Sequence, residues 1–246
     1  RIAMSPMCQY SCEDGFATDW HLVHLGSRAV GGTALIIVEA TGVEARGRIT
    51  PNCLGLWKDE HIAPLKKVTE FIHERGSVAG IQLAHAGVKA SRYRPFHPTP
   101  NKYVPIEDGG WMPVGPTAKR FSDDGPVPQM LSIDEIRGVR ESFVAATKRA
   151  IAAGFRIIEL HFAHGYLGHS FLSPLMNERT DGYGGPFDHR VSFLIDTDIC
   201  SAHLKGVGAV TGRFLQYTGR LHISVISAGE LYTWAYRATA PSRSAR

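Results

Sequence analysis

The sequence predicts an α/β fold with a parallel sheet, and three observations support that prediction. Short apolar segments that read as buried strands alternate with longer segments in which apolar residues recur at helical spacing. Strand, helix and strand follow one another repeatedly, and this order requires right-handed crossovers that leave the strands parallel. The length of 246 residues suits one domain, since single-domain α/β barrels commonly reach about 250 residues.

The first strand-helix-strand unit occupies the first forty residues. Residues 1–4 form a short strand that opens into a loop. Thr18 or Asp19 caps a helix whose apolar residues recur at helical spacing until the glycines at 31–32 end it. Residues 34–38 are a continuous apolar run, which is typical of a parallel strand that is covered on both faces.

Two further helices have clear start signals. One begins at Asp59 and stops at Gly76, and a strand at residues 78–84 follows at once. A capping box formed by Ser132 and Glu135 opens a longer helix, in which the apolar residues again recur at helical spacing.

The stretch 154–166 is the most informative part of the sequence. It contains a fourth strand, in which alternation separates the apolar side chains from Glu159 and His161. His164 and Tyr166 follow where the chain turns out of the sheet. Polar groups therefore collect at the carboxyl end of this strand, which is where parallel α/β folds place their chemistry.

Other predicted strands also end in polar residues. These residues are Glu39, Thr41, Gln82, His85 and His161. Because the carboxyl ends of parallel strands meet at one edge of a sheet, we expect these side chains to converge on one pocket.

Two segments lie outside the strand-helix alternation. Residues 87–130 are rich in proline, glycine and tryptophan and lack periodicity, so we expect a long, lid-like insertion over the strand ends. We expect residues 197–246 to form an atypical tail that is disordered or foreign to the fold. From residue 199 onward Glu230 is its only acid. Arg213, between Gly212 and Phe214, is its only residue in a sequence context like that of a later strand.

Composition and charge argue against membranes and nucleic acids as partners. No apolar run approaches the roughly 20 residues that span a bilayer, and no charged-then-apolar leader precedes the first strand. The net charge of +4 is mild and scattered. The four cysteines have irregular spacing without a Cys-x-x-Cys pair, so we expect a reducing, cytoplasmic setting with neither a zinc site nor a disulfide framework. They are Cys8, Cys12, Cys53 and Cys200.

Seven motifs resemble, in order and spacing, those of the Old Yellow Enzyme family of FMN-dependent ene-reductases. They are SPMCQY at 5–10, IVEA at 37–40, GRIT at 47–50, GIQLAHAG at 80–87, HFAHGYL at 161–167, FLSP at 171–174 and NERTDGYGG at 177–185. The cysteine in the first motif is similar to that of the xenobiotic-reductase and thermophilic-like branch. The resemblance covers residues 1 to about 196 and implies a (β/α)8 TIM barrel, of which about the first four strand-helix units are recognisable.

The resemblance implies an FMN that lies across the carboxyl ends of the strands, with NADPH or NADH as the hydride donor. Gln82, which both donates and accepts hydrogen bonds, suits the pyrimidine edge of the flavin. The residues that the resemblance assigns to FMN are Ser5, Pro6, Met7, Cys8, Ala40, Gln82 and His161.

The resemblance also implies roles toward a small enone or nitro substrate. His161 and His164 donate hydrogen bonds to the substrate oxygen as negative charge builds on it. Tyr166 delivers a proton to the α-carbon, and Tyr10 lies over the substrate. A homo-oligomer is compatible with this assignment.

Two alternatives stay open. His161, His164, His169 and Glu159 could be ligands of a metal-dependent barrel hydrolase. Such hydrolases usually place a His-x-His on the first strand, where this chain has Ser-Pro-Met-Cys, so we expect no metal. Alternatively, the chain is a truncated, catalytically incompetent fragment without stable FMN, because the phosphate-binding loops of later strands are not recognisable after Thr197.

Overall fold

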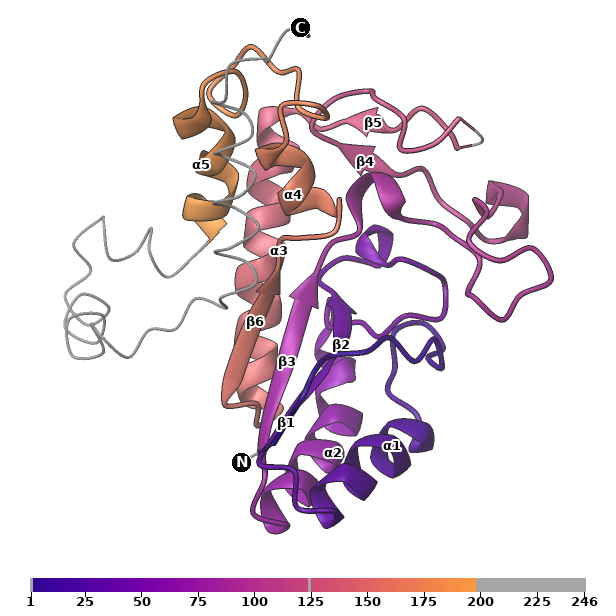
Figure 1. Cartoon of the computed structure of the whole chain (residues 1–246), viewed down its shortest axis with the longest axis vertical. Coiled ribbons are helices and arrows are strands. Elements are labelled where there is room, and N and C mark those ends of the chain that lie inside the picture. Colours follow the sequence, from indigo (N-terminus) through magenta and orange to yellow (C-terminus); the bar gives the residue numbers. More distant parts are fainter. Residues whose placement is uncertain (1, 124, 198–246) are drawn as a thin grey trace, which may run out of the picture. The chain divides into compact units, whose positions relative to one another are not determined.

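A four-stranded parallel sheet forms the centre of the computed structural model, which describes residues 2–123 and 125–197 (Figure 1). Its strands are β1 (Ala3–Met4), β2 (Leu35–Gly42), β3 (Val78–Ala84) and β6 (Ile157–His161). They lie in the order β1-β2-β3-β6, and each neighbouring pair is parallel. The prediction of a parallel α/β sheet is therefore confirmed.

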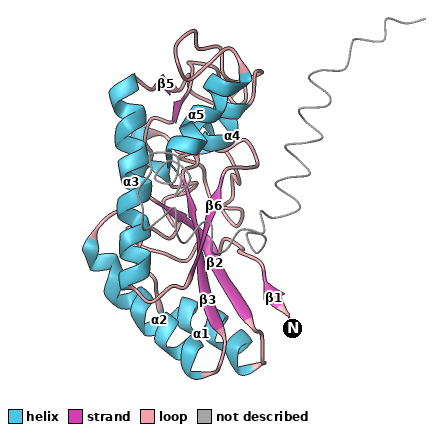
Figure 2. Ribbon diagram, turned by 90° about the vertical axis from the view of Figure 1, so that its left-hand side faces the viewer, coloured by secondary structure: helices cyan, strands magenta, loops and turns pink. Residues whose placement is uncertain are grey.

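Three long helices cover one face of this sheet, and Figure 2 shows them on the same side of the strands. They are α1 (Asp19–Val30), α2 (Ile62–Glu74) and α3 (Ile133–Ala152). Thr18 is the N-cap of α1. The Ser132 side chain accepts a hydrogen bond from the Glu135 backbone, so the predicted capping box opens α3.

The hydrophobic core lies between the sheet and these helices. Alternation in the strands sends Ile36, Val38 and Ile81 to the helical side, where each is at most 1% exposed. The helices meet them with Leu65 and Phe143, which belong to the same buried cluster. The spacing of apolar residues in the sequence therefore identifies the covered face correctly.

Two predicted boundaries are wrong by a few residues. Strand β2 continues past Val38 to Gly42, and its register with β3 shifts between Val38 and Ala40, which marks a β-bulge at Glu39. Glu39 and Thr41 therefore belong to the strand, and the bulge changes which of its side chains face the helices. Helix α2 begins at Ile62, after the short 3-10 helix Asp59–His61, and not at Asp59.

The segment 87–130 contains more structure than the predicted loop. Its strands β4 (Val114–Gly115) and β5 (Gln129–Met130) form a second, two-stranded parallel sheet. The indole Nε1 of Trp111 donates to the Arg46 carbonyl at 2.8 Å, which attaches the segment to the loop after β2. Two helices follow β6, namely α4 (Leu167–Leu172) and α5 (Phe187–Thr197).

Arg179 joins three segments that are distant in the sequence. Its guanidinium is buried and donates to the carbonyl oxygens of Pro116 and Leu131 at 2.9 and 2.6 Å. It also pairs with Asp181 at 2.6 Å. The hydrogen bonds from Arg179 lower the pKa of Asp181 below its usual range. The second sheet therefore depends on a motif in the loop between α4 and α5.

Residues 198–246 contain several of the features noted in the sequence, including Cys200, Arg213 and Glu230, and all lie outside the described residues. In the part of the chain that the structure describes, no helix is long and apolar enough to cross a membrane.

We predict that Arg179→Met lowers the free energy of unfolding by about 3–5 kcal/mol, because Asp181 loses its ion pair and two buried carbonyls lose their donor. Urea denaturation followed by circular dichroism measures this loss. Arg137→Met is the matched control, since Arg137 forms an exposed ion pair with Asp134, and its loss should change stability by only about 0.5 kcal/mol or less. Equal effects of the two substitutions would contradict the role assigned to Arg179.

Candidate functional site

The end of β6 and the turn after it carry the principal candidate residues. His161 is the last residue of β6, and the chain then turns through His164 and Gly165, which have φ values of 57° and 75°. Tyr166 is the N-cap residue of α4. A histidine with left-handed backbone angles is uncommon, so contacts around the turn must stabilise the backbone conformation of His164.

A close approach of two backbones places Tyr166. The Leu167 N–H donates to the His85 carbonyl at 3.0 Å, which joins the start of α4 to the end of β3. Gly87 has a φ of 59°, and a Cβ atom on it would lie 2.9 Å from the Leu167 Cα. Only glycine allows this approach, and this explains the glycine that ends the motif at 80–87.

His161, His164 and Tyr166 gather as the sequence predicts. The ring centroids of His161 and His164 are 5.0 Å apart, and those of His161 and Tyr166 are 4.9 Å apart. Each of these two pairs meets edge to face. Among the described residues, neither histidine ring has a side-chain or backbone hydrogen-bond partner, so both rings can donate to a bound molecule.

Burial keeps His161 and Tyr166 in their neutral forms at pH 7. It lowers the pKa of His161 to about 4, with a second contribution from His164. Burial also raises the pKa of Tyr166 well above its usual value. A neutral imidazole and a protonated phenol both donate hydrogen bonds, and the phenol retains a proton that it can transfer.

Lys89 belongs to this cluster, although the sequence reasoning missed it. Its Nζ donates to the His164 carbonyl at 2.7 Å and lies 5.7 Å from the centroid of the Tyr166 ring. The same ammonium lies 4.5 Å from the centroid of Phe121, within the segment 87–130. Its position two residues after the motif at 80–87 was the signal that could have identified it.

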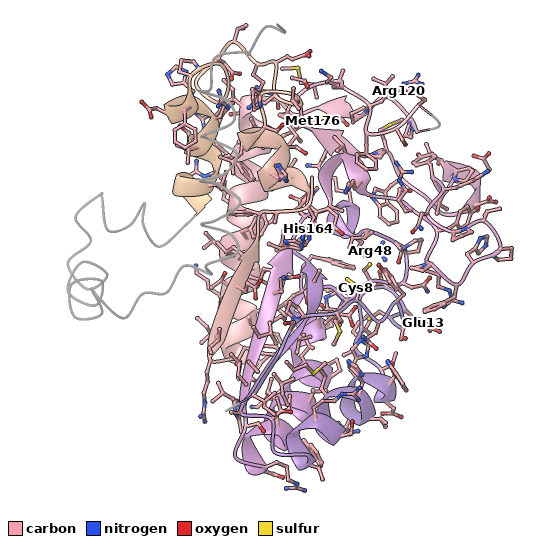
Figure 3. The ribbon with its side chains drawn as sticks, viewed as in Figure 1. Cys8, Glu13, Arg48, Arg120, His164 and Met176 are labelled. Carbon is pink, nitrogen blue, oxygen red and sulfur yellow. The ribbon has the colours of Figure 1, made fainter. Side chains whose placement is uncertain are left out.

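The loop after β1 brings a second group of candidates to the same end of the sheet. The Cys8 thiol interacts with the Tyr10 hydroxyl and the Ala40 backbone. Burial, with the nearby Cys53 and Glu39, raises the pKa of Cys8 to about 12, so it is a thiol at pH 7. Figure 3 shows Cys8 and His164 beyond the ends of the strands.

The remaining residues assigned to FMN lie on the loop after β1 or on neighbouring strands. Ser5 and Met7 are exposed on that loop and Pro6 is half-buried. Ala40 on β2 pairs with Gln82 on β3. The Gln82 amide donates to Glu159 Oε1 at 2.9 Å. Among the described residues its amide oxygen has no donor, so it remains available to a bound molecule.

Three of the polar residues expected to converge on this pocket do not do so. The bulge in β2 directs Glu39 to His21 on α1, at 3.0 Å. The Thr41 hydroxyl donates to the backbone carbonyl of Glu39 at 2.8 Å. His85 accepts from the Gly87 N–H and lies 3.4 Å from Glu44. Each of these side chains has a structural partner, so the expected convergence is wrong for them.

The proposed metal ligands have partners of other kinds. His169 accepts a hydrogen bond from the Gly165 N–H at 2.8 Å, and Glu159 accepts from Gln82. Over residues 2–123 and 125–197, no group of three or more His, Cys, Asp or Glu side chains is arranged to hold a metal ion.

Comparisons with known proteins identify the relatives of this chain. The model of the NADH:flavin oxidoreductase / NADH oxidase family matches residues 1–208. An NADH:flavin oxidoreductase of Gibberella zeae is 48% identical over 199 residues, which are 80% of this chain and 48% of that protein. An NADPH dehydrogenase of Bacillus cytotoxicus is 47% identical over 196 residues, which are 79% of this chain and 52% of that protein.

Solved structures give the same result for the fold. Morphinone reductase superimposes with a TM-score of 0.70 at 28% identity, covering 84% of this chain and 55% of that one. The old yellow enzyme homologue from Zymomonas mobilis has a TM-score of 0.68 at 28% identity, with coverages of 80% and 54%. The chain thus spans about half the length of these relatives, and its four parallel strands are part of a TIM barrel.

We predict that the imidazole of His161 titrates with a midpoint near pH 4, well below the ordinary value of 6.5. Because the unfolded chain then binds this proton more readily, the contribution of His161 to stability is present above about pH 6.5 and is lost as the pH falls through about 4. NMR titration of the His161 Cε1 proton measures the midpoint. His164→Asn should raise it, since one cause of the shift is removed. A midpoint near 6.5 in the unsubstituted chain would contradict the burial described above.

Proposed function

The chain belongs to the NADH:flavin oxidoreductase / NADH oxidase family, and from this premise we propose that it contributes the substrate-facing half of an FMN-dependent ene-reductase. In this proposal NADPH or NADH supplies hydride, and the enzyme reduces activated C=C bonds of α,β-unsaturated carbonyl or nitro compounds. The observation that carries the proposal is the group of three hydrogen-bond donors, His161, His164 and Tyr166, at the carboxyl end of β6.

The donor and acceptor set at the strand ends fits a flavin. Gln82 has an amide oxygen free of partners among the described residues, next to the backbone of Ala40 on β2. Cys8 presents a protonated thiol at the same edge of the sheet. A flavin pyrimidine ring offers both donors and acceptors, so this mixed set is complementary to it. Ser5, Pro6 and Met7 extend the contact along the loop after β1.

Bound FMN would supply hydride transfer to the β-carbon of the substrate. The chain's own residues then act on the oxygen of the substrate and on its α-carbon. His161 and His164 donate hydrogen bonds to the oxygen, whose negative charge increases toward the transition state, so these donors stabilise the transition state more than the ground state. Tyr166 carries the proton for the α-carbon.

Two further side chains orient the substrate in this proposal. Tyr10 lies beside Cys8 and close to Tyr166, so it can cover a substrate held by the two histidines. Lys89 fixes the His164 carbonyl and so supports the turn that presents the His164 ring.

A second candidate function rests on the length of the match. The chain spans about half of its relatives, and the described residues contain four parallel strands in the main sheet. Those residues offer contacts to the flavin ring, while the phosphate of FMN needs an anion site such as a helix N-terminus or glycine-rich loop. A family fragment that does not retain FMN is therefore the competing interpretation.

Equilibrium dialysis of the 246-residue chain against FMN tests the proposal directly. The proposal requires saturable binding and a flavin absorbance that survives desalting, through ring contacts from residues that the chain contains, whereas the fragment interpretation predicts weak binding or none. Gln82→Leu is the informative variant, since it keeps the side-chain volume and removes the amide. A colourless chain that does not bind FMN would contradict the proposal and favour the fragment interpretation.

We predict that Tyr166→Phe slows the oxidative half-reaction with a simple enone by about 10²- to 10⁴-fold, because the proton donor is lost. Reduction of the flavin by the nicotinamide should be nearly unchanged, and stopped-flow absorbance resolves the two steps. Tyr93→Phe is the matched control, because the Tyr93 hydroxyl bonds to Asp108 in the segment 87–130. An enone rate equal to that of the control would remove Tyr166 as the acid.

A further inference from the structure

Glu39 is a buried carboxylate that the proposed chemistry does not use. It lies at the bulge of β2 and is 3% exposed. One carboxylate oxygen lies 3.0 Å from His21 Nε2, and the other accepts the backbone N–H of Gln9 at 2.9 Å. Both oxygens therefore have partners, one on α1 and the other on the loop after β1.

The partner on α1 is a neutral histidine. The Thr18 N–H donates to His21 Nδ1 at 3.0 Å, so Nδ1 carries no proton and Nε2 must carry it. The Nε2–H then donates to Glu39, and the Cys12 sulfur lies 3.4 Å from the same nitrogen. Glu39 is thus held by hydrogen bonds from His21 and from the backbone, and His21 orients its carboxylate toward the loop.

The loop that Glu39 contacts is tightly anchored at Gln9. Besides the bond from its N–H, the Gln9 side chain accepts from Trp20 at 3.1 Å and donates to the Met7 carbonyl at 2.7 Å. The Gln9 carbonyl accepts from Ser11 at 3.0 Å. Gln9 therefore bonds through all four of its polar groups.

The residues on either side of Gln9 are the two that face the candidate site. Cys8 precedes it, and Tyr10 follows with a φ of 53°, in the left-handed region that a tyrosine rarely adopts. Such a conformation persists only where neighbouring contacts hold it. Among these contacts, the bond from Gln9 to Glu39 is the one made to a buried charge, and bonds to charged groups are the stronger kind.

We propose that Glu39 is a positioning residue whose carboxylate fixes the Gln9 backbone and thereby holds Cys8 and Tyr10 in the orientation that the flavin and substrate require. The bulge in β2 lies at Glu39, whose side chain contacts both α1 and the loop. That Glu39 holds the loop follows from the contacts of this chain, whereas the service of Cys8 and Tyr10 to flavin and substrate rests on the proposed function.

The test compares Glu39→Gln with Glu39→Met in the full 246-residue chain. The two side chains have nearly the same size, but only glutamine keeps an oxygen that can accept from Gln9. Hydrogen exchange at single-residue resolution should show that the methionine variant raises the exchange rate of the Gln9 amide by about 10- to 100-fold. Glutamine has a single oxygen, for which the Gln9 N–H and the His21 Nε2–H compete in the single variant. Combined with His21→Phe, which removes the competing donor, glutamine should keep the Gln9 exchange rate close to that of the unsubstituted chain. The Ile81 amide, in the middle of β3, reports whether the fold is intact.

The methionine variant leaves the His21 Nε2–H buried without an acceptor, which could unfold the chain. His21→Phe combined with Glu39→Met removes both partners, and such paired apolar replacements are close to neutral. This double variant still lacks an acceptor for Gln9, so it should show the same fast exchange at Gln9. A Gln9 rate unchanged in the folded double variant, or raised equally when glutamine replaces methionine in that double variant, would overturn the proposal.

A parallel FMN titration separates this inference from the proposed function. If the unsubstituted chain binds FMN, the methionine variants should bind it about tenfold more weakly, while the variant that combines His21→Phe with Glu39→Gln should not. Fast exchange at Gln9 with unchanged FMN affinity would overturn the link between the loop and the site. If the unsubstituted chain fails to bind FMN, the proposed function fails, and the exchange rates still decide whether Glu39 holds the loop.

Discussion

The parallel register of β2, β3 and β6 is the constraint on which the candidate site depends. Hydrogen bonding between these strands pairs Ala40 with Gln82 and Gln82 with Glu159, so residues from three distant segments lie in one row. Two pairs further along, the register brings His161 level with Ala84. A slip of one residue would turn Gln82 toward the helices and move His161 to the other face. The site exists because the core fixes that register.

Most of the fold could be predicted from the sequence because its elements carry strong local signals. The capping box at Ser132 opens α3 at the expected residue, and strand β3 has the expected bounds, since an apolar run directly follows the helix stop at Gly76. The grouping of His161, His164 and Tyr166 also followed from a strand that ends in polar residues. Local pattern and tertiary contacts agree in these segments.

The failures share a physical cause. Glu39, Thr41 and His85 resemble site residues in the sequence, but their partners come from α1, from the backbone of β2 and from the loop that contains Glu44. No periodic pattern reveals a β-bulge, which inserts one extra residue into the strand and so interrupts the alternation of its side chains. Lys89 was missed for the opposite reason, because its role arises from one bond to the backbone of a turn 75 residues away.

The buried guanidinium of Arg179 has a consequence for the order in which the chain acquires its structure. Its carbonyl partners at Pro116 and Leu131 precede it by 63 and 48 residues. During synthesis these two buried hydrogen bonds cannot form until the segment around Arg179 has been made. Loop closure over this sequence distance is slow relative to helix formation, so we expect the contacts of Arg179 to form after the helices.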